Sequence, residues 1–150
     1  MPHRSGTRQI NKIIVHNSDS EWGNAAIIDG WHRERGWSGI GYHFVILNGF
    51  QQNRGFYAGS EDGVVEDGRP LHKAGAHVKG ENDDSIGICL IGKHHFSPEQ
   101  LLQSLPKLLR RLLREYNLRA EDALFGHRDF SSHKTCPNFE VRHLLPLLEE

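Results

Sequence analysis

Long apolar runs and an excess of charge of one sign are both missing from this sequence of 150 residues. No apolar stretch approaches the roughly 18–20 residues that a membrane span requires, so an integral membrane protein is not expected. The formal net charge of -1 disfavours a general nucleic-acid-binding protein, because such proteins neutralise phosphates with excess lysine and arginine. The first twelve residues carry no apolar signal segment. We therefore expect a protein that stays in the cytoplasm where it is made until another agent releases it.

Cysteine is also scarce, since the chain has only Cys89 and Cys136. Tight Cys-x2-Cys pairs, which are typical of structural zinc sites, are absent, so a zinc finger is excluded. Cys89 lies in the apolar run SIGICLIG and is expected to be a small buried hydrophobic residue. A disulfide between the two cysteines is not expected in a chain without an export signal. Cys136 needs another explanation, because it lies in GHRDFSSHKTCPNF beside two histidines and a lysine.

The residues that are present predict a single α/β domain. Apolar residues make up 37% of the chain and charged residues 25%, a globular composition, and we expect one domain over residues 1–150 with a flexible segment at 1–9. Strands are predicted at 10–18, 42–49, 85–92 and 122–127, with 50–54 as a hairpin partner for the second. Alternation of these strands with helices predicts a mixed central β-sheet flanked by helices.

Helices are predicted at 24–37, from 97 onward and at 139–150. The second of these begins with the capping box SPEQ, and Pro106 is expected either to kink it or to mark a later start. The glycine-rich stretch 55–82 shows little periodicity and is expected to be a long functional loop.

Two strand ends and one loop supply candidate metal ligands. His16 ends the first predicted strand, His127 ends the last, and Cys136 lies nine residues further on. An open zinc site needs three protein ligands of this kind and leaves its fourth position to water. A thiol nucleophile is the alternative, since His127 or His133 could act as its base. The spacing permits both hypotheses and does not decide between them.

Four segments make the sequence similar to a known family. They are IIVHNS, WHRERGWSGIGYHFVI, GAHVKGENDDSIGICLIG and GHRDFSSHKTCP, in that order between residues 13 and 137. With them the chain resembles the zinc N-acetylmuramoyl-L-alanine amidases of the amidase type 2 class, which include small phage amidase lysozymes and the peptidoglycan recognition proteins of animals. The resemblance implies one Zn2+ per chain at the edge of the sheet, with His16, His127 and Cys136 as its ligands.

The resemblance also implies the remaining site residues. Tyr42 beside the zinc and Lys134 on the cysteine loop are the expected catalytic residues, as donors to the oxyanion formed during amide hydrolysis. His77 and Asn82 are expected to border the substrate groove. Cys136 is then a soft anionic ligand and not a nucleophile.

The partners and the place of action follow from this resemblance together with the composition and the lack of a signal segment. The expected substrate is the lactyl-L-alanine amide of peptidoglycan, with no membrane or nucleic-acid partner and a monomeric chain. A phage endolysin, which reaches the cell wall from the host cytoplasm, is favoured over a bacterial recycling amidase. A purely peptidoglycan-binding protein is disfavoured because all three ligands are present. Inhibition of a phage RNA polymerase, which some phage members perform, is an alternative or added role.

Overall fold

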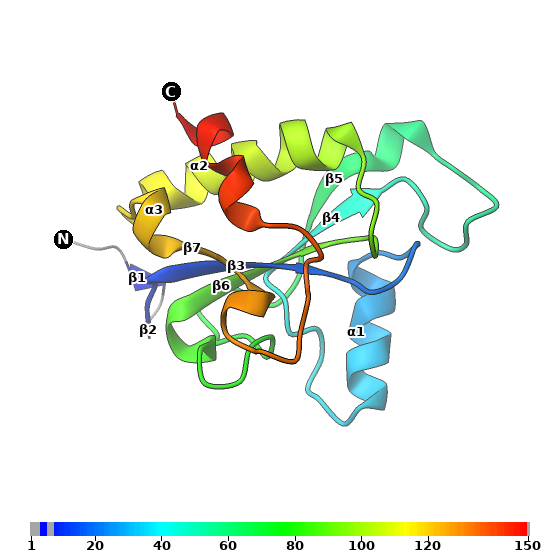
Figure 1. Cartoon of the computed structure of the whole chain (residues 1–150). Helices are drawn as coiled ribbons and strands as arrows, with labels where there is room; N and C mark the ends of the chain where they lie inside the picture. The colour runs from blue at the N-terminus through cyan, green and yellow to red at the C-terminus, as the bar shows by residue number, and fades with distance from the viewer. Residues whose placement is uncertain (1–3, 6–7, 150) are drawn as a thin grey trace.

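A five-stranded sheet forms the centre of the protein, with helices against both of its faces (Figure 1). The structure is a computed structural model that describes residues 4–5 and 8–149. The strands are β1 (Arg4–Ser5), β2 (Arg8–Gln9), β3 (Lys12–Asn17), β4 (Phe44–Asn48), β5 (Asp62–Asp67), β6 (Ser85–Leu90) and β7 (Leu124–Gly126). The helices are α1 (Ala25–Glu34), α2 (Leu105–Glu115), α3 (Ala120–Ala123), the π-helix η3 (Glu99–Ser104) and the 3₁₀ helices η1 (Gly59–Glu61), η2 (Asn82–Asp84), η4 (His127–Asp129) and η5 (Val141–Leu148).

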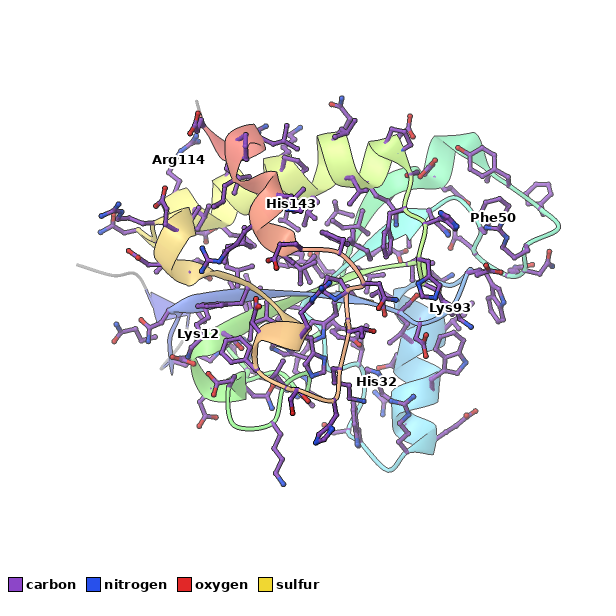
Figure 2. All side chains as sticks on the ribbon, viewed as in Figure 1. Lys12, His32, Phe50, Lys93, Arg114 and His143 are labelled. Atoms are coloured by element: carbon purple, nitrogen blue, oxygen red, sulfur yellow. The ribbon has the colours of Figure 1, made fainter. Side chains whose placement is uncertain are left out.

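The strand order β5-β4-β6-β3-β7 makes the sheet mixed. The pairs β4–β6, β6–β3 and β3–β7 are parallel, and only the edge strand β5 is antiparallel to its neighbour β4. This mixed sheet covered by helices confirms the predicted fold class. Lys12 and Lys93, at the left and right in Figure 2, mark the starting and finishing ends of the parallel strands. Because parallel strands finish at one edge, their following loops meet there.

Side-chain alternation gives the two faces of the sheet different contents. Ile13 and Val15 of β3 face α2 and η5, where the larger apolar cluster of the core lies. His16, the next residue, therefore points to the opposite face, which α1 covers. The smaller apolar cluster lies on that second face and consists of Ile28, Ile40, Val45, Leu47, Cys89 and Ile91. The buried position of Cys89 confirms the prediction from its apolar surroundings.

The predicted hairpin partner at 50–54 is wrong. The strand that pairs with β4 is β5, and it lies inside the stretch that was expected to be a loop. After β4 the chain turns at Gly49, whose φ of 89° favours glycine, and the Gly49 carbonyl accepts a hydrogen bond from the N–H of Ala58 at 2.8 Å. This contact closes a loop of irregular backbone, so the return strand starts further along the chain.

The capping box at the second helix is confirmed, and so is the later start of the α-helix. The Ser97 hydroxyl accepts from the N–H of Gln100 at 3.1 Å, and the Gln100 side chain accepts from the N–H of Ser97 at 2.8 Å. The first turns form the π-helix η3, and the α-helix begins only at Leu105, with Pro106 in its first turn. The terminal segment is the 3₁₀ helix η5 with Pro146 inside it, since proline cannot donate the hydrogen bond of an α-helix interior.

The amino-terminal segment is only partly described. Residues 1–3 and 6–7 of the stretch expected to be flexible lie outside the described residues. Arg8 anchors the described part, because its side chain donates to the carbonyls of Leu71 and Ser85, each at 2.8 Å. Within the described residues no helix is long and apolar enough to cross a bilayer.

Candidate metal centre

Three side chains from distant parts of the sequence meet at the finishing end of the parallel strands. His16 comes from β3, His127 from the start of η4 directly after β7, and Cys136 from the loop that follows. β3 and β7 are hydrogen-bonded neighbours, which brings the two histidines to adjacent positions. One ligand atom from each of the three residues can be chosen so that all lie within 4.8 Å of one another. The structure therefore brings together the three predicted ligands.

The thiol faces the first histidine directly. Cys136 Sγ lies 3.9 Å from His16 Nδ1 and accepts a hydrogen bond from the N–H of Asn17 at 3.2 Å. The ring centroids of His16 and His127 are 4.9 Å apart. The donor set is thus one thiol and two imidazoles around a common centre.

Local contacts hold the cysteine loop against β7. The N–H of Arg128 donates to the Cys136 carbonyl at 2.8 Å, and the Asp129 carboxylate accepts from the N–H of Gly126 at 2.8 Å. A Cβ on Gly126 would lie 2.9 Å from Pro137 Cδ, so glycine allows the proline to pack against the strand. These contacts explain why the motif GHRD…CP places its cysteine beside its histidine.

Burial sets the protonation of the candidate ligands. It lowers the pKa of His16 well below its usual value, assisted by the neighbouring His77 and His127, and it also lowers the pKa of His127. Both rings are therefore neutral at pH 7 and have a lone pair to offer a metal. Burial raises the pKa of Cys136 to about 11 despite the hydrogen bond from Asn17. A thiol in this state is a poor free nucleophile, whereas a bound cation would deprotonate it.

The chemistry of this donor set fits zinc. One thiolate and two neutral imidazoles are common zinc ligands, and three protein ligands leave a position open, as catalytic zinc sites require. Both cysteines lie in the described part of the chain and are free thiols, so a disulfide is excluded. His133, the rival ligand and rival base on the cysteine loop, is exposed and is not part of the cluster.

A cavity of about 530 Å³ opens beside the cluster and carries both predicted catalytic residues on its wall. Tyr42 lies 5.0 Å from His16 between ring centroids. Burial raises the pKa of the Tyr42 hydroxyl well above its usual value, with the thiols of Cys89 and Cys136 acting in the same direction. The hydroxyl therefore stays a proton donor at pH 7. Lys134 is exposed on the cysteine loop, two residues before Cys136.

The two residues that were predicted to border the substrate groove lie in different environments. His77 is on the cavity wall but is 9% exposed, and its Nδ1 lies 2.9 Å from His16 Nε2. The Asn82 carboxamide oxygen accepts from the N–H groups of His77 and Val78, at 2.9 and 3.0 Å. Asn82 therefore holds the backbone that carries His77.

Sequence reasoning did not find several residues around the site. Arg35 and Trp37 line the cavity, and Ser85 lies 3.1 Å from His77 Nε2. Gly87 faces the His77 ring, since a Cβ on it would lie 2.8 Å from the ring carbon Cγ. A glycine inside an otherwise apolar strand is the signal that could have indicated a close neighbour at this position.

Comparison with known proteins agrees with this architecture. The family model described as N-acetylmuramoyl-L-alanine amidase matches residues 6–139. The endolysin of Enterobacteria phage T3 is 38% identical over 120 residues, which cover 75% of this chain and 68% of that protein. The solved structure of the N-acetylmuramoyl-L-alanine amidase LysC from Clostridium intestinale has a TM-score of 0.73 at 29% identity and covers 94% of this chain and 87% of LysC. Peptidoglycan-recognition protein LB of Drosophila melanogaster is 32% identical over 106 residues, 69% of this chain and 40% of that protein.

The chain therefore belongs to the N-acetylmuramoyl-L-alanine amidase family. Its activity is that of the family, an N-acetylmuramoyl-L-alanine amidase, and the resemblance to phage endolysins and peptidoglycan recognition proteins is confirmed.

Proposed function

We propose that this amidase is a zinc-dependent phage endolysin that hydrolyses the amide between the lactyl group of N-acetylmuramic acid and the first L-alanine of the peptidoglycan stem peptide. The observation that carries the proposal is the cluster of His16, His127 and Cys136, whose ligand atoms lie within 4.8 Å beside a cavity. When bound there, zinc would polarise the amide carbonyl and lower the pKa of water towards ~7.

The chain's own residues have separate tasks in this reaction. Attack by water on the amide carbon places negative charge on the carbonyl oxygen. Hydrogen-bond donors are needed to stabilise that charge. The Tyr42 hydroxyl can donate because its raised pKa keeps it protonated. The Lys134 ammonium has no lone pair for a metal, but it lines the cavity and can donate a hydrogen bond to the oxyanion. The leaving amine must gain a proton, and Tyr42 Oη or Lys134 Nζ can deliver it.

The cavity wall supports a peptide substrate with acidic groups. Arg35 and Trp37 face the cavity from the end of α1 and the turn after it, and Arg35 lies over the Trp37 ring at 5.7 Å. Lys134 on the cysteine loop adds a second positive charge to the lining of the same cavity. Carboxylates of a stem peptide would be attracted to such a wall.

Two measurements test this function. Metal analysis of the purified protein should find about one zinc per chain, with activity lost on chelation and restored by zinc. Digestion of purified peptidoglycan should release peptides with a new L-alanine amino terminus and leave the glycan strands intact by mass spectrometry. New reducing sugar ends would refute the amidase assignment, and active protein without a bound transition metal would refute the zinc centre.

Three further expectations accompany this function. A monomeric chain is checked by size-exclusion chromatography, and binding to a phage RNA polymerase by a pull-down with the purified polymerase. Action on the wall after release from the host cytoplasm is checked by lysis of cells whose membrane has been permeabilised.

A further inference from the structure

The two nitrogens of the His16 ring face different partners. Nδ1 lies 3.9 Å from Cys136 Sγ and so points towards the candidate metal centre. Nε2 lies 2.9 Å from Nδ1 of His77, on the side away from the thiol. If Nδ1 is to offer its lone pair to a metal, the proton of the neutral ring must be on Nε2. Nε2 then donates, and His77 Nδ1 accepts.

The other ring nitrogen of His77 faces a third buried side chain, that of Ser85. With Nδ1 as acceptor, the neutral His77 ring carries its proton on Nε2, which lies 3.1 Å from Ser85 Oγ. Each ring nitrogen of His77 thus lies within hydrogen-bond distance of one side chain, with Nδ1 facing His16 and Nε2 facing Ser85. Ser85 is 0% exposed, and His16 is 1% exposed. The three side chains therefore form a largely buried hydrogen-bonded series in which each member fixes the proton position of the next.

The backbone around His77 is shaped to hold its ring in this place. Asn82 clamps the main chain by accepting from the N–H groups of His77 and Val78. Gly87 and Gly75 leave room for the ring, since a Cβ on either would lie 2.8 and 2.5 Å from ring carbons of His77. A ring fixed on its backbone and on both flanks has little freedom to turn towards a ligand.

We propose that His77 is a positioning residue that holds His16 in the tautomer and orientation required for metal binding, with Ser85 and Asn82 holding His77 in turn. This inference rests on the proposed zinc function. It differs from a substrate-binding role because both ring nitrogens of His77 are engaged inside the protein. Partners of metal-bound histidines typically change metal affinity or activity by about 10- to 100-fold when they are lost.

The first test observes the hydrogen bond itself. In nitrogen-labelled full-length protein, a through-hydrogen-bond scalar coupling is expected between His16 Nε2 and His77 Nδ1, both with zinc bound and after its removal. The ring-nitrogen spectrum should show the proton of His16 on Nε2. A His16 ring with its proton on Nδ1, or the absence of the coupling, would overturn the proposal.

The second test compares two variants of similar size. His77→Asn retains an acceptor where Nδ1 lies, whereas His77→Leu replaces it with a methyl group. Zinc affinity, measured by competition with a chromophoric chelator, should fall about 10- to 100-fold for His77→Leu and stay near the wild-type value for His77→Asn. Equal affinities for both variants would overturn the positioning role.

A matched control separates packing from positioning. His43 is another buried histidine beside Gly87. Its Nδ1 accepts a hydrogen bond from the N–H of Gly87 at 3.1 Å. Its Nε2 lies 2.9 Å from the Lys73 carbonyl. Both His43→Leu and His77→Leu should lower the melting temperature, but His43→Leu should leave zinc affinity unchanged. An equal loss of zinc affinity in both leucine variants would attribute the effect to packing and overturn the proposal.

The outcomes also distinguish this inference from the proposed function. A wild-type chain that binds zinc tightly but does not cut the lactyl-L-alanine amide would refute the reaction and retain the positioning role. An active zinc amidase whose His77→Leu variant binds zinc as tightly as the wild type would refute the positioning role alone.

Discussion

The two faces of the sheet are built from the same strands but carry different kinds of residue. The face towards α2 buries an almost purely apolar cluster, to which β3, β4 and β6 each contribute alternate residues. The face towards α1 has a smaller apolar cluster and, beside it, four buried histidines: His16, His32, His43 and His77. One face therefore provides most of the hydrophobic stabilisation, and the other can hold polar groups whose burial is unfavourable without hydrogen bonds.

The largest effect is expected from a substitution at the candidate metal centre, on the face of the sheet that α1 covers. Cys136→Ala removes the only anionic donor of the cluster, so zinc affinity and amidase activity should both collapse. Zinc content by elemental analysis and the rate of peptidoglycan hydrolysis are to be measured on the same preparation. A variant that keeps normal zinc affinity would show that Cys136 is not a ligand, and His133 would then be examined next.

Tyr42→Phe and Lys134→Ala test whether chemistry and metal binding on this face are separate. Both variants should retain zinc, because neither side chain belongs to the ligand cluster. Turnover should fall by about 10²–10³-fold in each, the usual effect of losing one oxyanion donor. Rates near the wild-type value for Lys134→Ala, measured with zinc content matched, would contradict its catalytic assignment.

A substitution on the opposite face should alter stability without altering the site. Leu109 in α2 is 0% exposed within the larger apolar cluster. Leu109→Ala should lower the free energy of unfolding by about 2–5 kcal/mol because it removes buried methyl groups and leaves a cavity. Chemical denaturation measures the loss, and zinc affinity of the folded variant serves as the control. A change in zinc affinity would show that the two faces are coupled.

The smallest effect is expected at the starting end of the strands. Lys12 Nζ lies 2.7 Å from both carboxylate oxygens of Asp84. Partial burial raises the pKa of Asp84, but hydrogen bonds from Lys12 and Asn11 outweigh it, so the pKa is lowered from 3.8 overall. Asp84→Asn should therefore reduce the free energy of unfolding by at most about 1 kcal/mol at pH 7.

This difference should depend on pH in one direction. A carboxylate with a lowered folded-state pKa stabilises the protein above its unfolded pKa and loses that contribution as the pH falls through the folded value. The difference between wild type and Asp84→Asn should thus be full at pH 7 and should shrink as the pH falls below about 4 and through the lowered folded-state pKa of Asp84. Denaturation curves at several pH values measure it, and a difference that grows on acidification would contradict the assignment.

Sequence patterns predicted the fold class and most elements because each was encoded locally. The β-branched run before His16, the capping box at Ser97 and the apolar run around Cys89 all correspond to elements in the structure. The strand β5 was missed because Val64 and Val65 are a short apolar pair among glycines and charged residues. β5 is an edge strand and is paired on one side only. Its sequence therefore has few of the apolar residues that mark a buried central strand.

What the sequence by itself determined is the inventory of the site: a histidine at the end of the first predicted strand, a second at the end of the last one and a cysteine nearby in the chain. Only the tertiary structure decided which nitrogen of His16 faces the thiol and which residue holds the other. His77 and Ser85 reach that position through a loop and a parallel strand pairing that bring residue 16 beside residue 77. Spacing along a chain carries no information on ring orientation, because orientation is set by hydrogen bonds and by the room that Gly75 and Gly87 leave across the fold.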